Sequence, residues 1–289
     1  TELAVRALDQ IIDYQRYPVP AAERSTKARR SLGIGYIGMA HYLAKKGLKY
    51  SDPDAARSVN RLTEAFQYYL IKASVQLARE KGPCEYFSRT KYSKGILPID
   101  TYKTDVDEFL GTDLHYDWEA LRKEVLEHGM RHSTLSAQMP SESSSVASNE
   151  TNGIEPPRAA MSTKKSKKGP LKQIVPQYNA LKNNYSYLYE EGVQEGYVRI
   201  VAAMQKYFDQ AISGNWSYNP KHYANNEVPM SVMFNDLLTT YKLGWKTSYY
   251  QNTYDMKGED EESVALEQQP VLQLQQVDDD SESCEACTI

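Results

Sequence analysis

The sequence of 289 residues predicts an α/β fold that is rich in helix. Segments with apolar residues three and four positions apart, which indicate amphipathic helices, dominate the first third of the chain. Two short segments, 133–139 and 247–253, have the alternation or the side-chain content of strands. Because helices alternate with these isolated strands, we expect an α/β arrangement with parallel pairing.

The first 80 residues contain three predicted helices. Residues 1–14 carry apolar side chains at positions 3, 5, 8, 11 and 12, the stripe of an amphipathic helix. Residues 25–46 form the second helix, and Ser51–Asp54 begins a long third helix that ends near Glu80. Nothing precedes Thr1 to cap the first helix, so we expect the chain to be the downstream part of something longer, either a fragment or one chain of a split protein.

The middle of the chain changes from helical to strand-like periodicity. Residues 116–129 predict a helix that ends at Gly129. Residues 133–139 alternate apolar and polar side chains, so we expect a short strand that ends at Pro140. A serine-rich loop and a short helix follow it.

The last predicted elements are a hairpin, two helices and a strand. Residues 159–171 place four lysines around a Gly-Pro turn and residues 171–175 return as a strand, which predicts a hairpin with a solvated tip. The helices are expected at 196–213 and 229–244, the second between a proline and a glycine. Residues 247–253 form the last strand.

Charge divides the chain into two predicted regions, a folded body over 1–257 and a tail over 258–289. The tail has ten Asp or Glu residues, no Lys or Arg and no aromatic residue, so little apolar area offsets its ordering entropy. We therefore expect it to be disordered and mobile. The body has all 34 basic residues and the remaining 28 of the 38 acidic ones, a net charge of +6. This mildly basic body suits anionic small molecules better than nucleic acid.

Hydropathy and cysteine content exclude membrane-spanning and disulfide-framed secreted proteins. No apolar run approaches the roughly 20 residues needed to span a bilayer, and no signal peptide opens the chain, so we expect no membrane partner. The three cysteines form no even framework of pairs. Such cysteine usage indicates the reducing cytoplasm.

Two of the three cysteines, Cys284 and Cys287, stand at the end of the acidic tail. Thiols on a mobile tether can exchange a disulfide at a buried site and then be reduced by another protein, so we interpret the tail as a dithiol shuttle arm. Half of a zinc site and a pair of idle thiols remain as alternatives. No second cysteine or histidine pair has matching spacing, so no metal site is predicted. Cys84, among aromatic residues, is expected to be a packed small hydrophobe.

The segment Pro140–Ser145 follows a predicted strand and precedes a helix. Free N–H groups at a helix start, together with serine hydroxyls, can cradle a phosphate or carboxylate, and open α/β folds bind ligands at the carboxyl ends of strands. A plain N-cap explains the serines equally well, so both interpretations remain open. The candidate binding residues are Pro140, Ser141, Glu142, Ser143, Ser144 and Ser145.

Residues 33–38 match the Gly-x-Gly-x-x-Gly pattern of dinucleotide-binding proteins, which would indicate a dehydrogenase. That fingerprint requires an apolar strand immediately upstream, whereas the polar residues 25–30 precede it here. We therefore interpret the glycines as sites of close helix packing.

Tyr249 and Tyr250 stand next to each other in the last predicted strand. Adjacent residues of a strand face opposite sides. In a chain with 23 tyrosines, core packing is the default interpretation of such a pair.

Five segments resemble the C-terminal portion of the large, catalytic subunit of class I ribonucleotide reductase, of the bacterial and phage aerobic type known as class Ia. They are Arg29–Gly35, Lys94–Lys103, His115–Arg122, Asn152–Arg158 and Tyr249–Thr253. The resemblance extends along nearly the whole chain. It implies an α/β barrel of ten strands built from two halves, of which this chain supplies roughly the second half and the tail.

The resemblance also implies a function, the reduction of ribonucleoside diphosphates to 2′-deoxyribonucleoside diphosphates by a radical mechanism. Pro140–Ser145 match the loop that holds the substrate diphosphate. Tyr249 and Tyr250 match the stacked pair that relays the radical, and Cys284 and Cys287 match the pair that re-reduces the active-site disulfide. The family's thiyl-forming cysteine lies upstream and has no counterpart here, so the chain alone is expected to be inactive. A non-catalytic scaffold that binds the small subunit is the alternative.

The same resemblance implies the partners. They are the N-terminal half of the large subunit, the small subunit with its di-iron tyrosyl radical, and thioredoxin or glutaredoxin. ATP and dNTP effectors bind mostly on the missing N-terminal part, and no cofactor is expected in this chain. Some relatives space the tail cysteines further apart, and the closer spacing here bears on which redoxin serves them.

Overall fold

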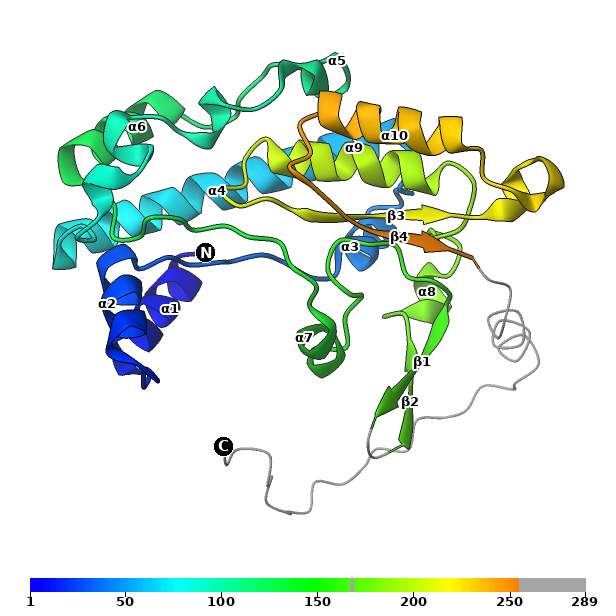
Figure 1. Ribbon diagram of the computed structural model, residues 1–289, viewed down its shortest axis with the longest axis horizontal. Coiled ribbons are helices and arrows are strands. Elements are labelled where there is room, and N and C mark those ends of the chain that lie inside the picture. The colour runs from blue at the N-terminus through cyan, green and yellow to red at the C-terminus, as the bar shows by residue number, and fades with distance from the viewer. Residues whose placement is uncertain (167–168, 255–289) are drawn as a thin grey trace. The chain divides into compact units, whose positions relative to one another are not determined.

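The computed structural model of the protein describes residues 1–166 and 169–254 (Figure 1). The described residues form one compact unit. The predicted tail, with Cys284 and Cys287, therefore lies outside the described residues. The predicted boundary between residues 257 and 258 stays a prediction.

Helices are the main elements of the described residues. The predicted helices at the N-terminus, after Ser51, before Gly129 and after Pro229 are confirmed, and so is the short helix after Pro140. The α-helices are α1 (Glu2–Tyr14), α2 (Pro20–Arg29), α3 (Met39–Lys45), α4 (Pro53–Lys81), α5 (Asp107–Leu110), α6 (Trp118–His128), α7 (Glu142–Ala147), α8 (Tyr178–Leu181), α9 (Val193–Gln205) and α10 (Met230–Lys242).

The long helix α4 packs beside α9 along the middle of this unit (Figure 1). Pro53 starts α4 because its fixed φ suits the first helical position and its missing N–H is not needed there. Close approach near the start of α4 requires Gly196 on α9, since a Cβ at that position would lie 1.8 Å from the carbonyl oxygen of Tyr50. The two helices thereby bring their apolar faces together.

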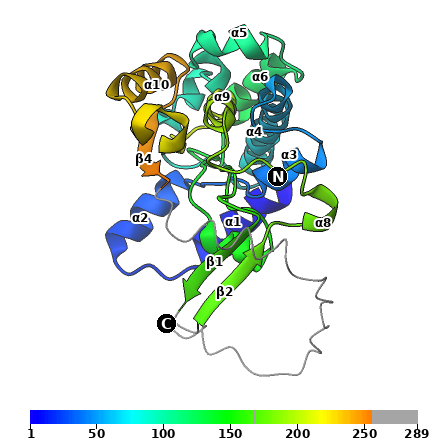
Figure 2. The same ribbon diagram turned by 90° about the vertical axis from the view of Figure 1, so that its right-hand side faces the viewer.

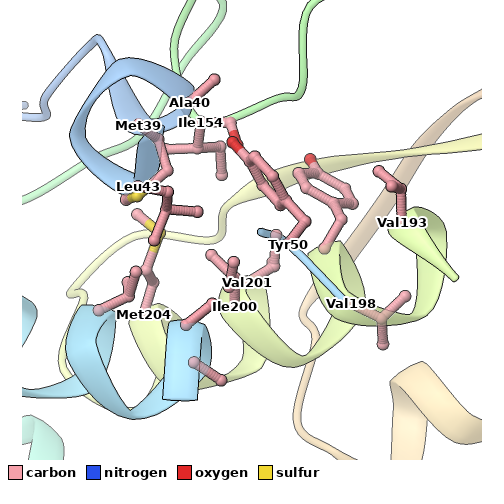
Figure 3. Close-up of a cluster of buried hydrophobic side chains, with 14 of the residues drawn as sticks. Met39, Ala40, Leu43, Tyr50, Ile154, Val193, Val198, Ile200, Val201 and Met204 are labelled. Carbon is pink, nitrogen blue, oxygen red and sulfur yellow. The ribbon is translucent and has the colours of Figure 1, made fainter. Parts of the chain in front are cut away.

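Two clusters of buried apolar side chains form the core. The first joins α3, the start of α4 and α9, and Figure 3 shows Met39 and Leu43 of α3 beside Met204 of α9, with Tyr50 and Ile154 alongside. The second joins α1, α4 and α6. Burial of this apolar area is the main force that fixes the helices around the extended segments.

Parallel pairing connects the extended segments. Strand β3 (Ser213–Tyr218) pairs in parallel with β4 (Thr247–Thr253). Residues 31–37 and 133–139 run parallel and meet at the Ile34–Ser136 bridge, and Gln210 N–H donates to the Ser136 carbonyl over 3.2 Å. Figure 1 shows the segment between α2 and α3, the segment between α6 and α7, and the strands β3 and β4. All four run in the same direction. The predicted parallel pairing is confirmed for them, although 133–139 forms one isolated bridge rather than a regular strand.

The prediction of one continuous helix over residues 25–46 is wrong. Helix α2 ends at Arg29, Arg30 takes a left-handed conformation (φ 48°), and the chain is extended until α3 begins at Met39. A Cβ on Gly35 would lie 2.4 Å from the carbonyl oxygen of Ala137. Gly33 and Gly35 therefore let two extended segments approach each other, while Gly38 takes the left-handed conformation (φ 77°) that precedes α3. The prediction of helix packing at these glycines is wrong as well.

The predicted hairpin is confirmed, with β1 (Met161–Ser166) antiparallel to β2 (Gly169–Ile174). Figure 2 shows it on the opposite side of the described unit from α5 and α10. The helix predicted over 196–213 ends earlier, at Gln205, because strand β3 begins at Ser213. Of the helices that the structure describes, none has the length and apolar character needed to cross a membrane.

Candidate functional site

The predicted binding loop, Pro140–Ser145, leaves the carboxyl end of the extended segment 133–139 and enters α7. Asn152 fixes its start, because the Asn152 Oδ1 accepts hydrogen bonds from the Ser141 N–H (3.2 Å) and the Ser141 hydroxyl (3.4 Å). Ser141 precedes α7 but makes no side-chain cap. The N-cap interpretation therefore does not account for its hydroxyl.

The first turn of α7 presents backbone donors to solvent. Within residues 1–166 and 169–254, the N–H groups of Ser143 and Ser144 have no hydrogen-bond partner, as expected for a first helical turn. Glu142, Ser143 and Ser144 are exposed. Ser145 is only 1% exposed and its hydroxyl donates to the Glu142 carbonyl over 2.9 Å. Two exposed amides and neighbouring hydroxyls are the groups that bind phosphate oxygens at helix starts.

Tyr249 and Tyr250 lie at a β-bulge in β4. Gly214 pairs with Ser248 and Trp216 with Gln251, so both tyrosines face the single residue Asn215 across the strand pair. Such a bulge interrupts the alternation of side chains. Regular strand geometry predicts that the two tyrosines point to opposite sides of the sheet. At this bulge they do not. Their ring centroids are 4.2 Å apart at an interplanar angle of 54°.

The two phenols share a hydrogen bond at the protein surface. The Tyr250 hydroxyl donates to the Tyr249 hydroxyl over 3.4 Å, and this bond raises the pKa of Tyr250 above its ordinary value. Tyr249 is 52% exposed and Tyr250 57%, so the core-packing interpretation is wrong. Two adjoining exposed phenols with a hydrogen bond between them suit stepwise transfer of an electron together with a proton.

Asn215 connects the tyrosine pair to a partly buried carboxylate. The Asn215 Oδ1 accepts from the Tyr250 N–H over 3.1 Å, and the Asn215 Nδ2 donates to Glu155 over 2.5 Å. Burial raises the pKa of the Glu155 carboxyl, while the hydrogen bond from Asn215 and the charge of Arg158 oppose that rise. The amide therefore holds both the bulge and a carboxyl group that burial disfavours as an anion.

A single turn serves both candidate sites. Asn152 holds the binding loop, and Glu155, three residues later, reaches the tyrosine pair through Asn215. A cavity of about 40 Å³, lined by Pro140 and these three residues among others, lies between them. The structure therefore connects the two predicted sites through one turn of the chain.

Asn215 and strand β3 were not predicted. The signal was present but short, since polar Ser213, Asn215 and Ser217 alternate with Gly214 and larger aromatic residues. Cys84 is buried, which confirms its predicted packing role. In the described part of the chain, no group of three His, Cys, Asp or Glu side chains is arranged to hold a metal ion.

A family model described as "Ribonucleotide reductase, barrel domain" matches residues 1–191 and 178–251. The chain belongs to this ribonucleotide reductase family. The matched residues include the loop 140–145 and both tyrosines of the bulge, and they end before Cys284 and Cys287. The predicted family resemblance is confirmed.

Curated relatives of this ribonucleotide reductase chain are named as alpha subunits of ribonucleoside-diphosphate reductase. That of Haemophilus influenzae is 58% identical over 252 residues, 87% of this chain and 33% of the relative. Subunit alpha of reductase 1 from Escherichia coli is 54% identical over 84% of this chain and 32% of the relative. The bacteriophage T4 subunit is 44% identical over 91% of this chain and 35% of the relative. The chain thus spans about a third of the length of these relatives.

Proposed function

We propose that the chain is a component of ribonucleoside-diphosphate reductase, which reduces ribonucleoside diphosphates to 2′-deoxyribonucleoside diphosphates by a radical mechanism. The observation that carries the proposal is the exposed, hydrogen-bonded pair Tyr249–Tyr250 at the bulge of β4. The names of the relatives support the same reaction. Because the chain covers only about a third of those relatives, it acts with the remaining part of a large subunit.

In this proposal Tyr249 and Tyr250 relay an unpaired electron. One phenol loses an electron and its hydroxyl proton, and it regains both when the neighbouring phenol is oxidised in turn. The hydroxyl contact of 3.4 Å supplies the route for the proton. No atom is consumed, so the pair returns to its starting state after each transfer in both directions.

The loop Pro140–Ser145 holds the diphosphate of the substrate in this proposal. The exposed N–H groups of Ser143 and Ser144 donate to phosphate oxygens, and the positive end of the α7 dipole favours the anion. Asn152 keeps the start of the loop in place through Ser141. Substrate and relay then lie on either side of the turn that contains Glu155.

Cys284 and Cys287 form the proposed dithiol shuttle. A thiolate of the pair attacks the active-site disulfide of the subunit and forms a mixed disulfide, and the second thiolate releases the reduced active site. The tail leaves as a disulfide, which thioredoxin or glutaredoxin reduces. No Lys or Arg occurs within residues 258–289 to favour the thiolate, so a docked partner has to supply the positive charge.

The proposed partners supply the functional groups that this chain does not contain. The rest of the large subunit supplies the reacting cysteine and the sites for ATP and dNTP effectors. The small subunit supplies the radical from its di-iron tyrosyl centre. Dependence on thioredoxin or glutaredoxin agrees with a reducing cytoplasm.

A scaffold that binds a partner protein without joining an active site is the second candidate. Helix α10 favours it, because this helix exposes a row of large apolar side chains. The row consists of Met230, Phe234, Leu237, Leu238 and Tyr241.

A reconstitution assay separates the two candidates. The chain is combined with the rest of the large subunit and the small subunit, and formation of deoxyribonucleoside diphosphate is measured with thioredoxin as reductant. The proposal expects product in the complete mixture and none when any component is omitted. A complete assembly that forms without making product supports the scaffold instead.

A further inference from the structure

A large cavity lies at the amino ends of the parallel segments, away from the loop 140–145 at the carboxyl end of one of them. Its volume is about 660 Å³, within the usual range of small-molecule sites. Ser31 and Ser133 line it where the two extended segments begin, and Gln210 and Lys246 line it just before β3 and β4. Neither the loop Pro140–Ser145 nor the pair Tyr249–Tyr250 lines this cavity.

The lining of the cavity is strongly cationic. It contains six basic side chains and a single carboxylate, that of Asp209. Five of the six are exposed and only Lys206 is buried, so the cations line a cavity that is open to solvent. Basic side chains gathered around one cavity create a field that favours anionic ligands. The six are Arg29, Arg89, Lys91, Lys103, Lys206 and Lys246.

Asp209 does little to neutralise this charge. Its carboxylate accepts hydrogen bonds from the Tyr92 hydroxyl and from the N–H groups of Leu135 (2.7 Å) and Ser136 (3.2 Å). Burial raises the pKa of the Asp209 carboxyl. The Asp209 oxygens therefore accept from these three donors and form no ion pair with the cations of the cavity.

One of the six cations, Lys206, has an ion-pair partner in the described structure: its ammonium group lies 3.0 Å from the Asp107 carboxylate. Throughout residues 1–166 and 169–254, no carboxylate lies within ion-pair distance of the other five. Desolvation lowers the pKa of Lys246, and the charge of Lys91 lowers it further against the opposing effect of Asp209. Five of the six like charges thus have no ion-paired carboxylate within the part of the chain that the structure describes.

Aromatic side chains complete the cavity. The Arg29 and Arg89 guanidinium groups lie 5.0 and 4.1 Å from the centroid of the Tyr86 ring, and Lys103 lies 5.5 Å from that of Tyr241. Ring contacts of this kind hold cationic groups in position while leaving their N–H donors available. Guanidinium groups bind phosphate oxygens in a bidentate manner.

We propose that this cavity is a second ligand site of the chain, which binds a small molecule bearing phosphate groups. Five uncompensated cations match a ligand with several negative charges better than a monoanion. The site goes beyond the proposed reductase function, and its test requires no turnover. The shared ligand chemistry is the phosphate group, carried either by an inorganic polyphosphate or by a nucleoside phosphate whose base contacts the tyrosine rings.

Calorimetric titration of the full chain with inorganic tripolyphosphate, and separately with ATP, tests the proposal at low salt. We expect saturable binding that weakens at least about tenfold in the double variant Lys91→Gln/Lys246→Gln, because each removed cation loses a charge-assisted contact. The matched control is Lys72→Gln/Lys123→Gln, which removes the same charge from exposed positions of α4 and α6. We expect less than about a twofold change there, as for surface charges away from a site.

The outcomes are distinct. If tripolyphosphate and ATP bind with equal affinity, the site recognises the phosphate groups alone. If ATP binds more tightly and this advantage is lost in Tyr241→Ala, the ligand is a nucleoside phosphate. Neither lysine of the double variant belongs to the buried core, so circular dichroism should report an unchanged fold. Absence of saturable binding, or equal weakening in both double variants, overturns the proposal.

Discussion

The side-chain amide of Asn215 donates a hydrogen bond of 2.5 Å to the carboxylate of Glu155. The same amide accepts from the backbone of Tyr250 over 3.1 Å, at the bulge where two tyrosines oppose one residue. One asparagine therefore couples the geometry of an exposed tyrosine pair to a partly buried carboxyl group. This coupling gives the first two predictions.

Replacing Asn215 with alanine should lower both stability and turnover. Glu155 loses its donor while its carboxyl group stays partly buried, which costs about 1 kcal/mol of unfolding free energy. The bulge also loses its side-chain acceptor, so the tyrosine pair is less well positioned. Denaturant unfolding and reductase assays of the assembled enzyme measure the two effects. Asn183→Ala, at an exposed position, is the control, and equal behaviour of the two variants contradicts the prediction.

Glu155→Gln should stabilise the protein at neutral pH. The folded-state pKa of Glu155 lies above its ordinary value of 4.5 because of burial. Its contribution is therefore fully present below pH 4.5 and is lost as the pH rises through the folded pKa. Glutamine still accepts from Asn215 but never ionises. The stability difference between variant and wild type should shrink as the pH falls toward 4.5, and a difference independent of pH argues against the raised pKa.

Local sequence signals predicted most of the helices. Helices α4 and α10 were found because each begins at or just after a proline and has apolar residues at helical spacing. The same reasoning failed for residues 25–46. Their extended part is fixed by Gly35, which approaches Ala137 about a hundred residues later. Local periodicity contains no information on such a contact.

The candidate site was predictable in part. The loop after Pro140 followed from its serines and its place between a strand and a helix. The arrangement of Tyr249 and Tyr250 did not, because it depends on the register between β3 and β4, and a bulge reverses the alternation that a strand pattern predicts. The predicted roles of the tyrosines came from the family resemblance rather than from their spacing.

Asn152→Ala should weaken substrate binding without changing the chemical step. The variant removes the acceptor that holds the Ser141 N–H and hydroxyl, so the loop loses about 1 kcal/mol of positioning free energy. We expect KM for the ribonucleoside diphosphate to rise roughly fivefold while kcat is retained, the pattern of lost uniform binding. Steady-state kinetics with the assembled enzyme measure both constants. A fall in kcat at constant KM would mean that Asn152 takes part in the reaction and not in positioning the binding loop.

Tyr249→Phe and Tyr250→Phe should each abolish turnover and leave substrate binding intact. Phenylalanine keeps the ring but has no hydroxyl to lose a proton, and the only change is the loss of a phenol oxygen from the Tyr249–Tyr250 hydrogen bond. Reduction of substrate by the assembled enzyme and equilibrium binding of substrate are the two measurements. Tyr14→Phe removes a phenol hydroxyl at a position that is 92% exposed and should retain full activity. Normal turnover in either variant of the pair ends the relay proposal.

Cys284→Ser should stop turnover driven by thioredoxin or glutaredoxin while a small dithiol still supports it. The variant leaves one thiol in the tail, and a single thiol forms the mixed disulfide but cannot resolve it into a tail disulfide. A small dithiol reaches the active-site disulfide directly and bypasses the tail. Rates with each reductant are compared in the assembled enzyme, with Ser283→Ala as the control from the same segment. If Cys284→Ser keeps the wild-type rate with either redoxin, the tail is no shuttle, and the active site has to be reduced by another route.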